Sequence, residues 1–198
     1  LAASRLSESI VSRDLHFRRF PMRTNPLEGV DKPWGPTPQY AATEYCPWRG
    51  RLLVGEVHDE NAFSLGGVAG HAGLFGTACG IVRWLTLLWR LYKNESWSAE
   101  WNSDTVREFW DRSDTSPSGT WALGFDTPSP SGSSAGRYFS PHSVGHLGFT
   151  GTSFWLDLQR DLLVVILTNR VYPSRRNEGI KAFRPLVHDA VMKGLHAA

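Results

Sequence analysis

Two histidines and two carboxylates lie close together in the first half of the sequence, as His58, Asp59, Glu60 and, a little further on, His71. Imidazole nitrogens and carboxylate oxygens are common ligands of zinc and related metals. Their spacing, however, matches neither His-Glu-x-x-His nor another established metal-binding pattern. We therefore predict no metal and no cofactor, and expect these residues to lie in a loop that borders a cleft.

A serine and a histidine three residues apart, Ser143 and His146, could supply a nucleophile and a base. The segment that holds them is predicted to be a strand, in which residues three apart point to opposite faces. Without a bulge they cannot form a catalytic pair. The sequence also lacks Gly-x-Ser-x-Gly, which excludes an α/β-hydrolase.

The elements that would position these residues differ between the two halves of the chain. In the second half we predict strands at 121–125, 143–149, 153–158 and 162–168, a long loop at 126–137, and a helix at 177–195 that Pro185 should open or kink. Gln159-Arg160-Asp161 is a short link, so the last two strands should form an antiparallel hairpin.

The first half has fewer periodic stretches. We predict a short helix and turn at 1–25, an irregular segment at 26–60 anchored by Trp34, Tyr45 and Trp48, glycine-rich turns at 64–76, a buried helix from Thr77, and a second helix capped by Ser103. The fold class is therefore α+β, with helices packed on an antiparallel sheet. We expect one domain over 1–198, mostly helix and loop up to residue 120, with the main sheet and the terminal helix after it.

The composition is that of an ordinary globular protein, with 41% hydrophobic and 20% charged residues and a formal net charge of +2. No basic block points to nucleic acid. The most apolar stretch is interrupted by arginines and too short to span a bilayer, and no signal peptide is visible. Cys46 and Cys79 are expected to be buried free thiols.

The segment Gly145-His146-Leu147-Gly148-Phe149-Thr150-Gly151-Thr152-Ser153 resembles the third motif of the serine β-lactamase and penicillin-binding-protein superfamily. That motif is Lys-Thr-Gly in many members and His-x-Gly in one branch. Further blocks occur in the order expected for carboxypeptidase-type and esterase-type members: Thr43–Gly50, Gly55–Ala62 and Gly66–Phe75. The resemblance covers about residues 20–195 and implies an incomplete fold of the β-lactamase and transpeptidase type.

The first motif of that superfamily, Ser-x-x-Lys, is absent. It pairs a serine with a lysine one helical turn away, and none of the four lysines here has a serine three residues before it. The second motif, Tyr-x-Asn, has one match in Tyr92-Lys93-Asn94, which we interpret as the end of a helix. We expect Leu1 to lie downstream of both motifs.

The resemblance implies roles for the residues of the third motif. The backbone N–H of Phe149, which follows Gly148, would stabilise the oxyanion, and His146 would face the substrate or a proton-transfer chain. Thr150, Gly151 and Thr152 would help to bind substrate, as would His58 and His71 on neighbouring loops. The strand could also pair with an extended substrate through its main chain. Leu147 departs from the pattern, because the family often has a carboxylate-binding Thr or Ser there; Thr150 or Thr152 would have to replace that contact.

The resemblance therefore implies part of a serine hydrolase that attacks an amide or ester carbonyl through an acyl-enzyme. Candidate substrates are D-alanyl peptides, β-lactams or small esters. Two alternatives stay open: a non-catalytic module that binds peptides, and a truncated gene product. Many members of the family are periplasmic or secreted. We predict that the isolated chain is inactive, and that the loops at 56–62, 66–73 and 126–137 lie near His146 and Phe149.

Overall fold

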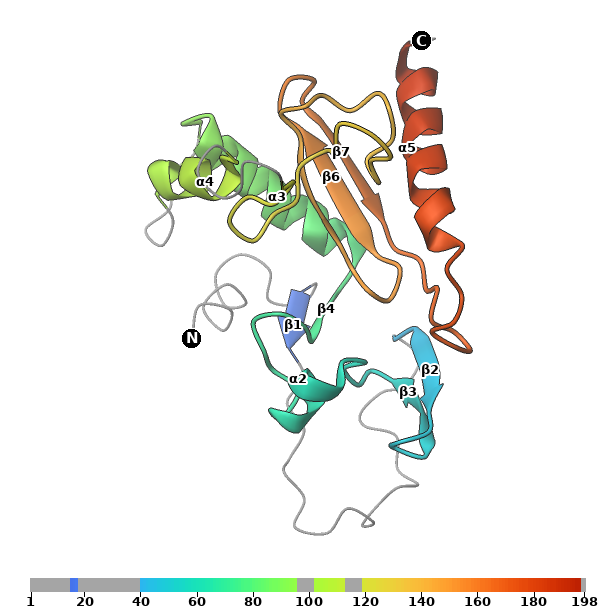
Figure 1. The fold of residues 1–198 in the computed structure, drawn as a ribbon. Coiled ribbons are helices and arrows are strands. Elements are labelled where there is room, and N and C mark those ends of the chain that lie inside the picture. The colour runs from blue at the N-terminus through green and yellow to red at the C-terminus, as the bar shows by residue number, and fades with distance from the viewer. Residues whose placement is uncertain (1–14, 18–39, 96–101, 113–118, 197–198) are drawn as a thin grey trace. The chain divides into compact units, whose positions relative to one another are not determined.

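The structure is a computed structural model that describes residues 15–17, 40–95, 102–112 and 119–196 (Figure 1). These residues fall into two compact units. The first unit runs up to Ile81 and also includes Asn169–Asn177, and the second comprises Val82–Thr168 and the residues from Glu178 onward. The expectation of a single domain stays a prediction.

The second unit is built on a three-stranded antiparallel sheet. Its strands, in spatial order, are β5 (Val144–Leu147), β6 (Ser153–Asp157) and β7 (Leu162–Ile166). The register pairs His146 with Phe154 and Phe154 with Val165. The three predicted strands and their hairpin are confirmed. The physical reason is that the short link at 159–161 lets the apolar strand β7 pair only antiparallel with β6.

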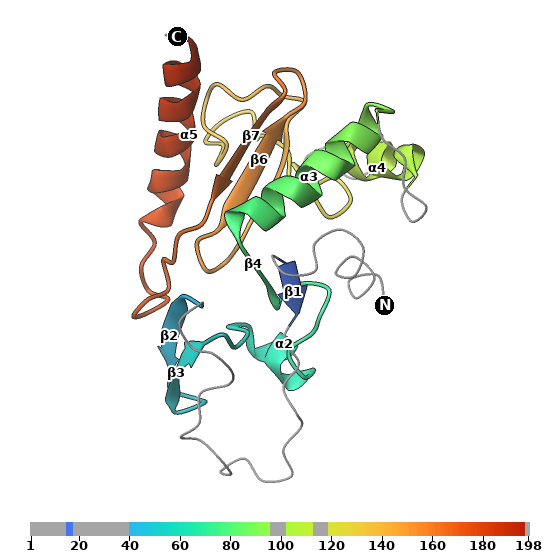
Figure 2. The ribbon, with the colours of Figure 1, turned by 180° about the vertical axis from the view of Figure 1, so that it is seen from behind.

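Helices cover both faces of this sheet (Figures 1 and 2). On one face, Leu88 and Leu91 of α3 (Ala78–Tyr92) pack with Val144 and Leu156 of the sheet. Val106 and Trp110 of α4 (Ser103–Trp110) join the same cluster. On the other face, Met192 of α5 (Ile180–His196) packs against Trp155. Because paired residues of neighbouring strands share a face, His146 lies on the α3 side of the sheet and Trp155 on the α5 side.

The helix ends follow the local sequence. Thr77 caps α3 through a bond from the Gly80 amide to its hydroxyl, at 3.1 Å, as predicted. At the other end Asn94 adopts a left-handed conformation, with φ of 59°, and so ends the helix. This placement confirms that Tyr92-Lys93-Asn94 is a helix terminus. The cap of α4 is Asn102, one residue before the predicted Ser103, because its side chain accepts from the Asp104 amide.

In its described residues, the first unit contains two short pairs of antiparallel strands, where we expected helix and loop. Strand β1 (Leu15–Phe17) pairs with β4 (Leu74–Gly76), so the predicted helix at 1–25 is wrong at Leu15–Phe17; the rest of that range lies outside the described residues. Strand β2 (Ala42–Cys46) pairs with β3 (Arg51–Val54), and α2 spans Glu60–Ser64.

The β2–β3 hairpin corrects the expectation of an irregular segment at 26–60. Gly50, at φ of 65°, closes its turn, and the Gly50 amide donates to the Cys46 carbonyl at 2.8 Å. The predicted anchors Tyr45 and Trp48 are exposed, whereas Cys46 and Leu53 are buried. Alternation in the hairpin turns every second side chain outward, and Tyr45 falls on the outer face. Trp34 lies outside the described residues.

Three further expectations are corrected. Residues 121–125 form no strand; Trp121 makes only an isolated bridge to Asp126, which in turn bridges to Gly145 of β5. Helix α5 continues through Pro185, so the predicted opening of the helix does not occur, while the alternative of a kink stays a prediction. Cys46 is buried but Cys79 is exposed, in the first turn of α3. Across the described ranges, every helix is too short or too polar to cross a membrane.

Candidate functional site

His146 stands exposed on the edge strand β5, beside an aromatic surface. The Trp121 ring meets its imidazole edge to face, with ring centroids 5.7 Å apart. On the same face of the sheet, Phe154 packs edge to face against Trp84 of α3. Asp126 and Gly145 exchange two backbone hydrogen bonds, which bring the start of the 126–137 loop to the outer edge of β5. The prediction that the 126–137 loop lies near His146 is thus confirmed.

The β5–β6 turn holds the remaining residues of the third motif. The Gly148 amide donates to the Thr152 carbonyl at 2.7 Å, and the Gly151 amide donates to the Gly148 carbonyl at 3.1 Å. Phe149 and Thr150 form the tip, and the Phe149 side chain is 58% exposed. The turn therefore brings Gly148, Phe149, Thr150, Gly151 and Thr152 together next to His146.

Two side chains from other elements bind the carbonyls of this turn. Nη2 of Arg184, on α5, donates to the carbonyl oxygens of Gly148 at 2.8 Å and Thr152 at 2.7 Å. The Thr168 hydroxyl, just after β7, donates to the Gly151 carbonyl at 2.6 Å. The turn is thus fixed to both the terminal helix and the last strand.

Glycine is required at two motif positions because larger residues would collide with neighbours. A Cβ at Gly145 would lie 2.5 Å from ring atoms of Trp155, and one at Gly148 would lie 2.0 Å from the Thr152 hydroxyl. The buried Trp155 indole therefore lies directly over the backbone of β5.

Leu147, the departure from the family pattern, has a packing role. Its side chain belongs to the cluster of Trp155, Phe139 and Met192 between the sheet and α5, on the face opposite to His146. An apolar residue suits that environment, whereas a hydroxyl there would lose its water without gaining a partner. Ser143 is also buried, with its hydroxyl 3.3 Å from that of Ser140.

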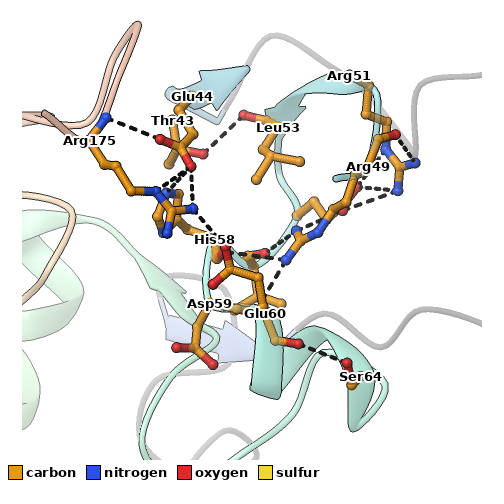
Figure 3. Close-up of polar contacts among 12 residues, drawn as sticks. Thr43, Glu44, Arg49, Arg51, Leu53, His58, Asp59, Glu60, Ser64 and Arg175 are labelled. Carbon is orange, nitrogen blue, oxygen red and sulfur yellow. Dashed lines mark hydrogen bonds and ion pairs between the residues drawn. The ribbon is translucent and has the colours of Figure 1, made fainter. Parts of the chain in front are cut away.

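A charged cluster occupies the first unit (Figure 3). Nε2 of His58 lies 3.1 Å from Oε1 of Glu44, and both side chains are buried. Arg175 bonds the carboxylate of Glu44 and, at 2.7 Å, that of Glu60. Burial by itself would raise the pKa of Glu44, but the bonds from Arg175 outweigh it and hold that pKa below its usual value. Burial lowers the pKa of His58, against the attraction of Glu44.

A buried arginine shapes the loop that carries His58 and Asp59. Nη1 of Arg49 donates to Glu56 at 2.9 Å and to the Val57 carbonyl at 2.6 Å, while Nη2 donates to the carbonyls of His58 and Asp59. The Phe63 ring covers the guanidinium, with its centroid 4.1 Å from Cζ. Arg49 thus fixes the backbone on which His58 stands.

The second predicted histidine of this unit, His71, is exposed. Its Nε2 lies 3.0 Å from Oδ1 of Asp59, which also accepts from the Ala62 amide and so caps α2. The hydrogen bond from the Ala62 amide and the contact with His71 lower the pKa of Asp59. The structure brings His71 next to Asp59 and His58 next to Glu44. Within the described parts of the chain, no cluster of three or more His, Cys, Asp or Glu side chains is arranged to hold a metal.

The predicted site residues therefore fall in two places. His146 and the turn residues belong to the second unit, and His58 and His71 to the first, so the closeness of the 56–62 and 66–73 loops to His146 stays a prediction. Sequence reasoning missed Arg184, Glu44 and Arg175. A lone arginine in an amphipathic helix gives no signal of the carbonyls that it will meet, and Glu44 and Arg175 are far apart in the sequence.

Comparison with known proteins places this chain in a family. The family model described as Beta-lactamase matches residues 19–187. An N-acetylmuramyl-L-alanine amidase from Bacillus subtilis is 36% identical over 165 residues, which cover 74% of this chain and 35% of that protein. A protein proposed to be a D-alanyl-D-alanine carboxypeptidase, from Escherichia coli K12, is 34% identical over 131 residues, covering 62% of this chain and 28% of that protein.

The chain thus spans about a third of the length of the curated relatives it matches. Among solved structures, a beta-lactamase from Mycobacterium bovis is similar with a TM-score of 0.49 and 20% identity, over 62% of this chain and 46% of that one.

Proposed function

This chain belongs to the Beta-lactamase family, and from that membership we propose that it forms the oxyanion-binding part of a serine hydrolase. The observation that carries the proposal is that the exposed His146, near the end of β5, is followed after one residue by Gly148 and Phe149 of the β5–β6 turn. In this reading the Phe149 amide donates to the oxyanion that develops when a serine attacks an amide or ester carbonyl.

Hydrolysis through an acyl-enzyme proceeds in two steps. The serine oxygen bonds to the carbonyl carbon, the amine or alcohol leaves with a proton, and water then releases the acid and restores the serine. His146 would stand beside the substrate or the proton-transfer chain, with Thr150, Gly151 and Thr152 forming the wall next to it. His58 and His71 are proposed as substrate contacts from neighbouring loops.

Candidate substrates are D-alanyl peptides, β-lactams and small esters. The names of the amidase and carboxypeptidase relatives both describe alanine-containing amides, which favours an amide of that class. The exposed Trp121 and Phe149 side chains would offer apolar surface to the acyl or leaving group.

The first test is acylation of the 198-residue chain itself. Covalent catalysis needs an activated nucleophile, and no serine here has a lysine three residues after it. We therefore expect no mass increase after incubation with a penicillin or a fluorophosphonate, by intact-mass spectrometry. A stoichiometric adduct on one serine, abolished by prior heat denaturation, would contradict this expectation.

The second test supplies the missing pair. A segment that carries Ser-x-x-Lys, taken from a member of the family and fused in front of this chain, should form a stoichiometric adduct on the serine of that motif. The same fusion with that serine changed to alanine is the control. A folded fusion that binds a D-alanyl peptide but never acylates would favour the alternative, a peptide-binding module without turnover.

A further inference from the structure

One nitrogen of a buried arginine bridges the neck of the β5–β6 turn. Arg184 is 6% exposed, and both hydrogens of its Nη2 are directed at carbonyls, those of Gly148 and Thr152. Each of these carbonyls also accepts a backbone amide of the turn. We propose that Arg184 is a positioning residue, which orients and polarises the Phe149 N–H for its work as the oxyanion donor. This inference rests on the proposed function.

The orientation follows from the planarity of the peptide bond. The Gly148 carbonyl and the Phe149 amide belong to one peptide unit, in which C=O and N–H point in opposite directions. Arg184 holds the carbonyl oxygen on the α5 side, at 2.8 Å. The Phe149 N–H is therefore directed away from Arg184, and it can turn only if that charged hydrogen bond breaks.

The polarisation follows from the charge. A cation at the carbonyl oxygen draws electron density through the peptide unit and leaves the amide hydrogen more positive, and hydrogen bonds that share one peptide group strengthen one another. The effect is large here because the guanidinium is buried. Thr168 fixes the next carbonyl of the turn, that of Gly151, through a neutral hydroxyl, and so adds rigidity without charge.

Nuclear magnetic resonance on the 198-residue chain tests the contact directly. In the wild-type chain we expect a through-hydrogen-bond coupling between Nη2 of Arg184 and the Gly148 carbonyl carbon. In Arg184→Met we expect the Phe149 amide nitrogen to move upfield by more than any amide outside residues 147–153. Arg184→Lys, which keeps the charge on a shorter side chain, should shift it by an intermediate amount.

The matched control is Arg137→Met. Arg137 also binds α5, through Asp189 at 2.9 Å, but its side chain is 77% exposed and it does not touch the turn. Equal Phe149 shifts in Arg184→Met and Arg137→Met would overturn the proposal, as would the absence of the wild-type coupling. The wild-type coupling and the Arg184→Lys shift decide the matter if Arg184→Met does not fold.

Catalysis gives an independent measurement in the fusion described above. Arg184→Met should lower kcat about 10- to 100-fold with KM changed little, somewhat less than the roughly 100- to 1000-fold loss for removing an oxyanion donor outright. Arg184→Lys should restore part of that loss. An unchanged kcat in the variant overturns the positioning role. A fusion that never acylates, with the resonance shifts as expected, contradicts the proposed function and leaves the orientation of the amide established.

Discussion

His188 shows how burial changes the chemistry of a single residue in this chain. Its side chain is fully buried on α5, where Nδ1 lies 2.9 Å from the Ser134 carbonyl and Phe139 packs edge to face against the ring. Burial lowers its pKa, and the nearby Arg184 acts in the same direction, while the Ser134 bond and Asp189 act against them. The folded chain therefore holds His188 in its neutral form.

This state makes stability depend on pH. The unfolded chain takes up the proton near the usual pKa of about 6.5, whereas the folded chain does so only at lower pH. The free energy of unfolding should therefore be highest above that value and fall as the pH drops below it, until the folded pKa is passed. We expect His188→Asn, whose amide can still donate to Ser134, to lose stability less steeply between pH 7.5 and 5, as measured by urea titration at each pH. An unchanged slope would show that His188 is not the group responsible, and would point to the buried His58.

At the scale of elements, one carboxylate organises the β6–β7 hairpin. Asp157, fully buried at the end of β6, accepts from the Ser140 amide and hydroxyl, the amides of Gln159 and Arg160, and the Arg160 guanidinium. Burial would raise the pKa of Asp157, but these donors lower it overall. The hairpin is thus fixed at its turn by side-chain chemistry and along its strands by apolar packing.

Asp157→Asn should destabilise the chain by about 1–3 kcal/mol, because an amide cannot accept at its nitrogen and leaves buried donors without a partner. The pKa of Asp157 is lowered on folding, so its stabilisation is fully present above the usual value of 3.8, declines as the pH drops below 3.8, and is lost once the pH falls through the lower pKa of the folded state. The difference between the variant and the wild type, from urea titrations, should therefore shrink toward pH 3.

The control for this prediction lies in the same hairpin. Asp161 is exposed, has a positive φ of 56°, and pairs with Lys93 at 3.6 Å. Asparagine tolerates that conformation, and an exposed ion pair contributes little. Asp161→Asn should change stability by less than about 0.5 kcal/mol. Comparable losses in both variants would mean that the buried donors of Asp157 are not the cause.

In the molecule as a whole, the chain passes from the second unit into the first and back again. Residues 169–177 belong to the first unit, yet they follow β7 and precede α5, both of the second. Arg175 in this segment bonds Glu44 and Glu60, and the Asn169 side chain bonds the Ala42 carbonyl. If β7 and α5 unfolded, both ends of this segment would be released. The buried Glu44 carboxylate would then lose its partner, Arg175.

We therefore expect a single cooperative transition. Unfolding followed by tryptophan fluorescence, to which Trp48 of the first unit and several tryptophans of the second unit contribute, should coincide with unfolding followed by far-ultraviolet circular dichroism. A Glu44→Gln, Arg175→Gln variant, which removes the ionic tie without leaving a buried charge alone, should separate the two curves. Two transitions in the wild type would contradict the expectation of one domain.

The elements whose signals are local could be predicted from the residues alone. The alternation and apolar runs of β5–β7, the Thr77 cap of α3 and the α+β class all follow from spacing and residue type, and the His-x-Gly block led to the Beta-lactamase family. The missing Ser-x-x-Lys is likewise plain from the residues.

Contacts between groups that are distant in the sequence became visible in the folded chain. The β1–β4 pair is too short to show a pattern, and the Glu44–Arg175 and Arg184–Gly148 contacts join residues far apart in the chain. Such contacts depend on how apolar faces pack, because packing brings the polar groups between them together and then requires each to find a partner. For that reason the sequence could mark Gly148 and Phe149, but not the arginine that holds their peptide unit in place.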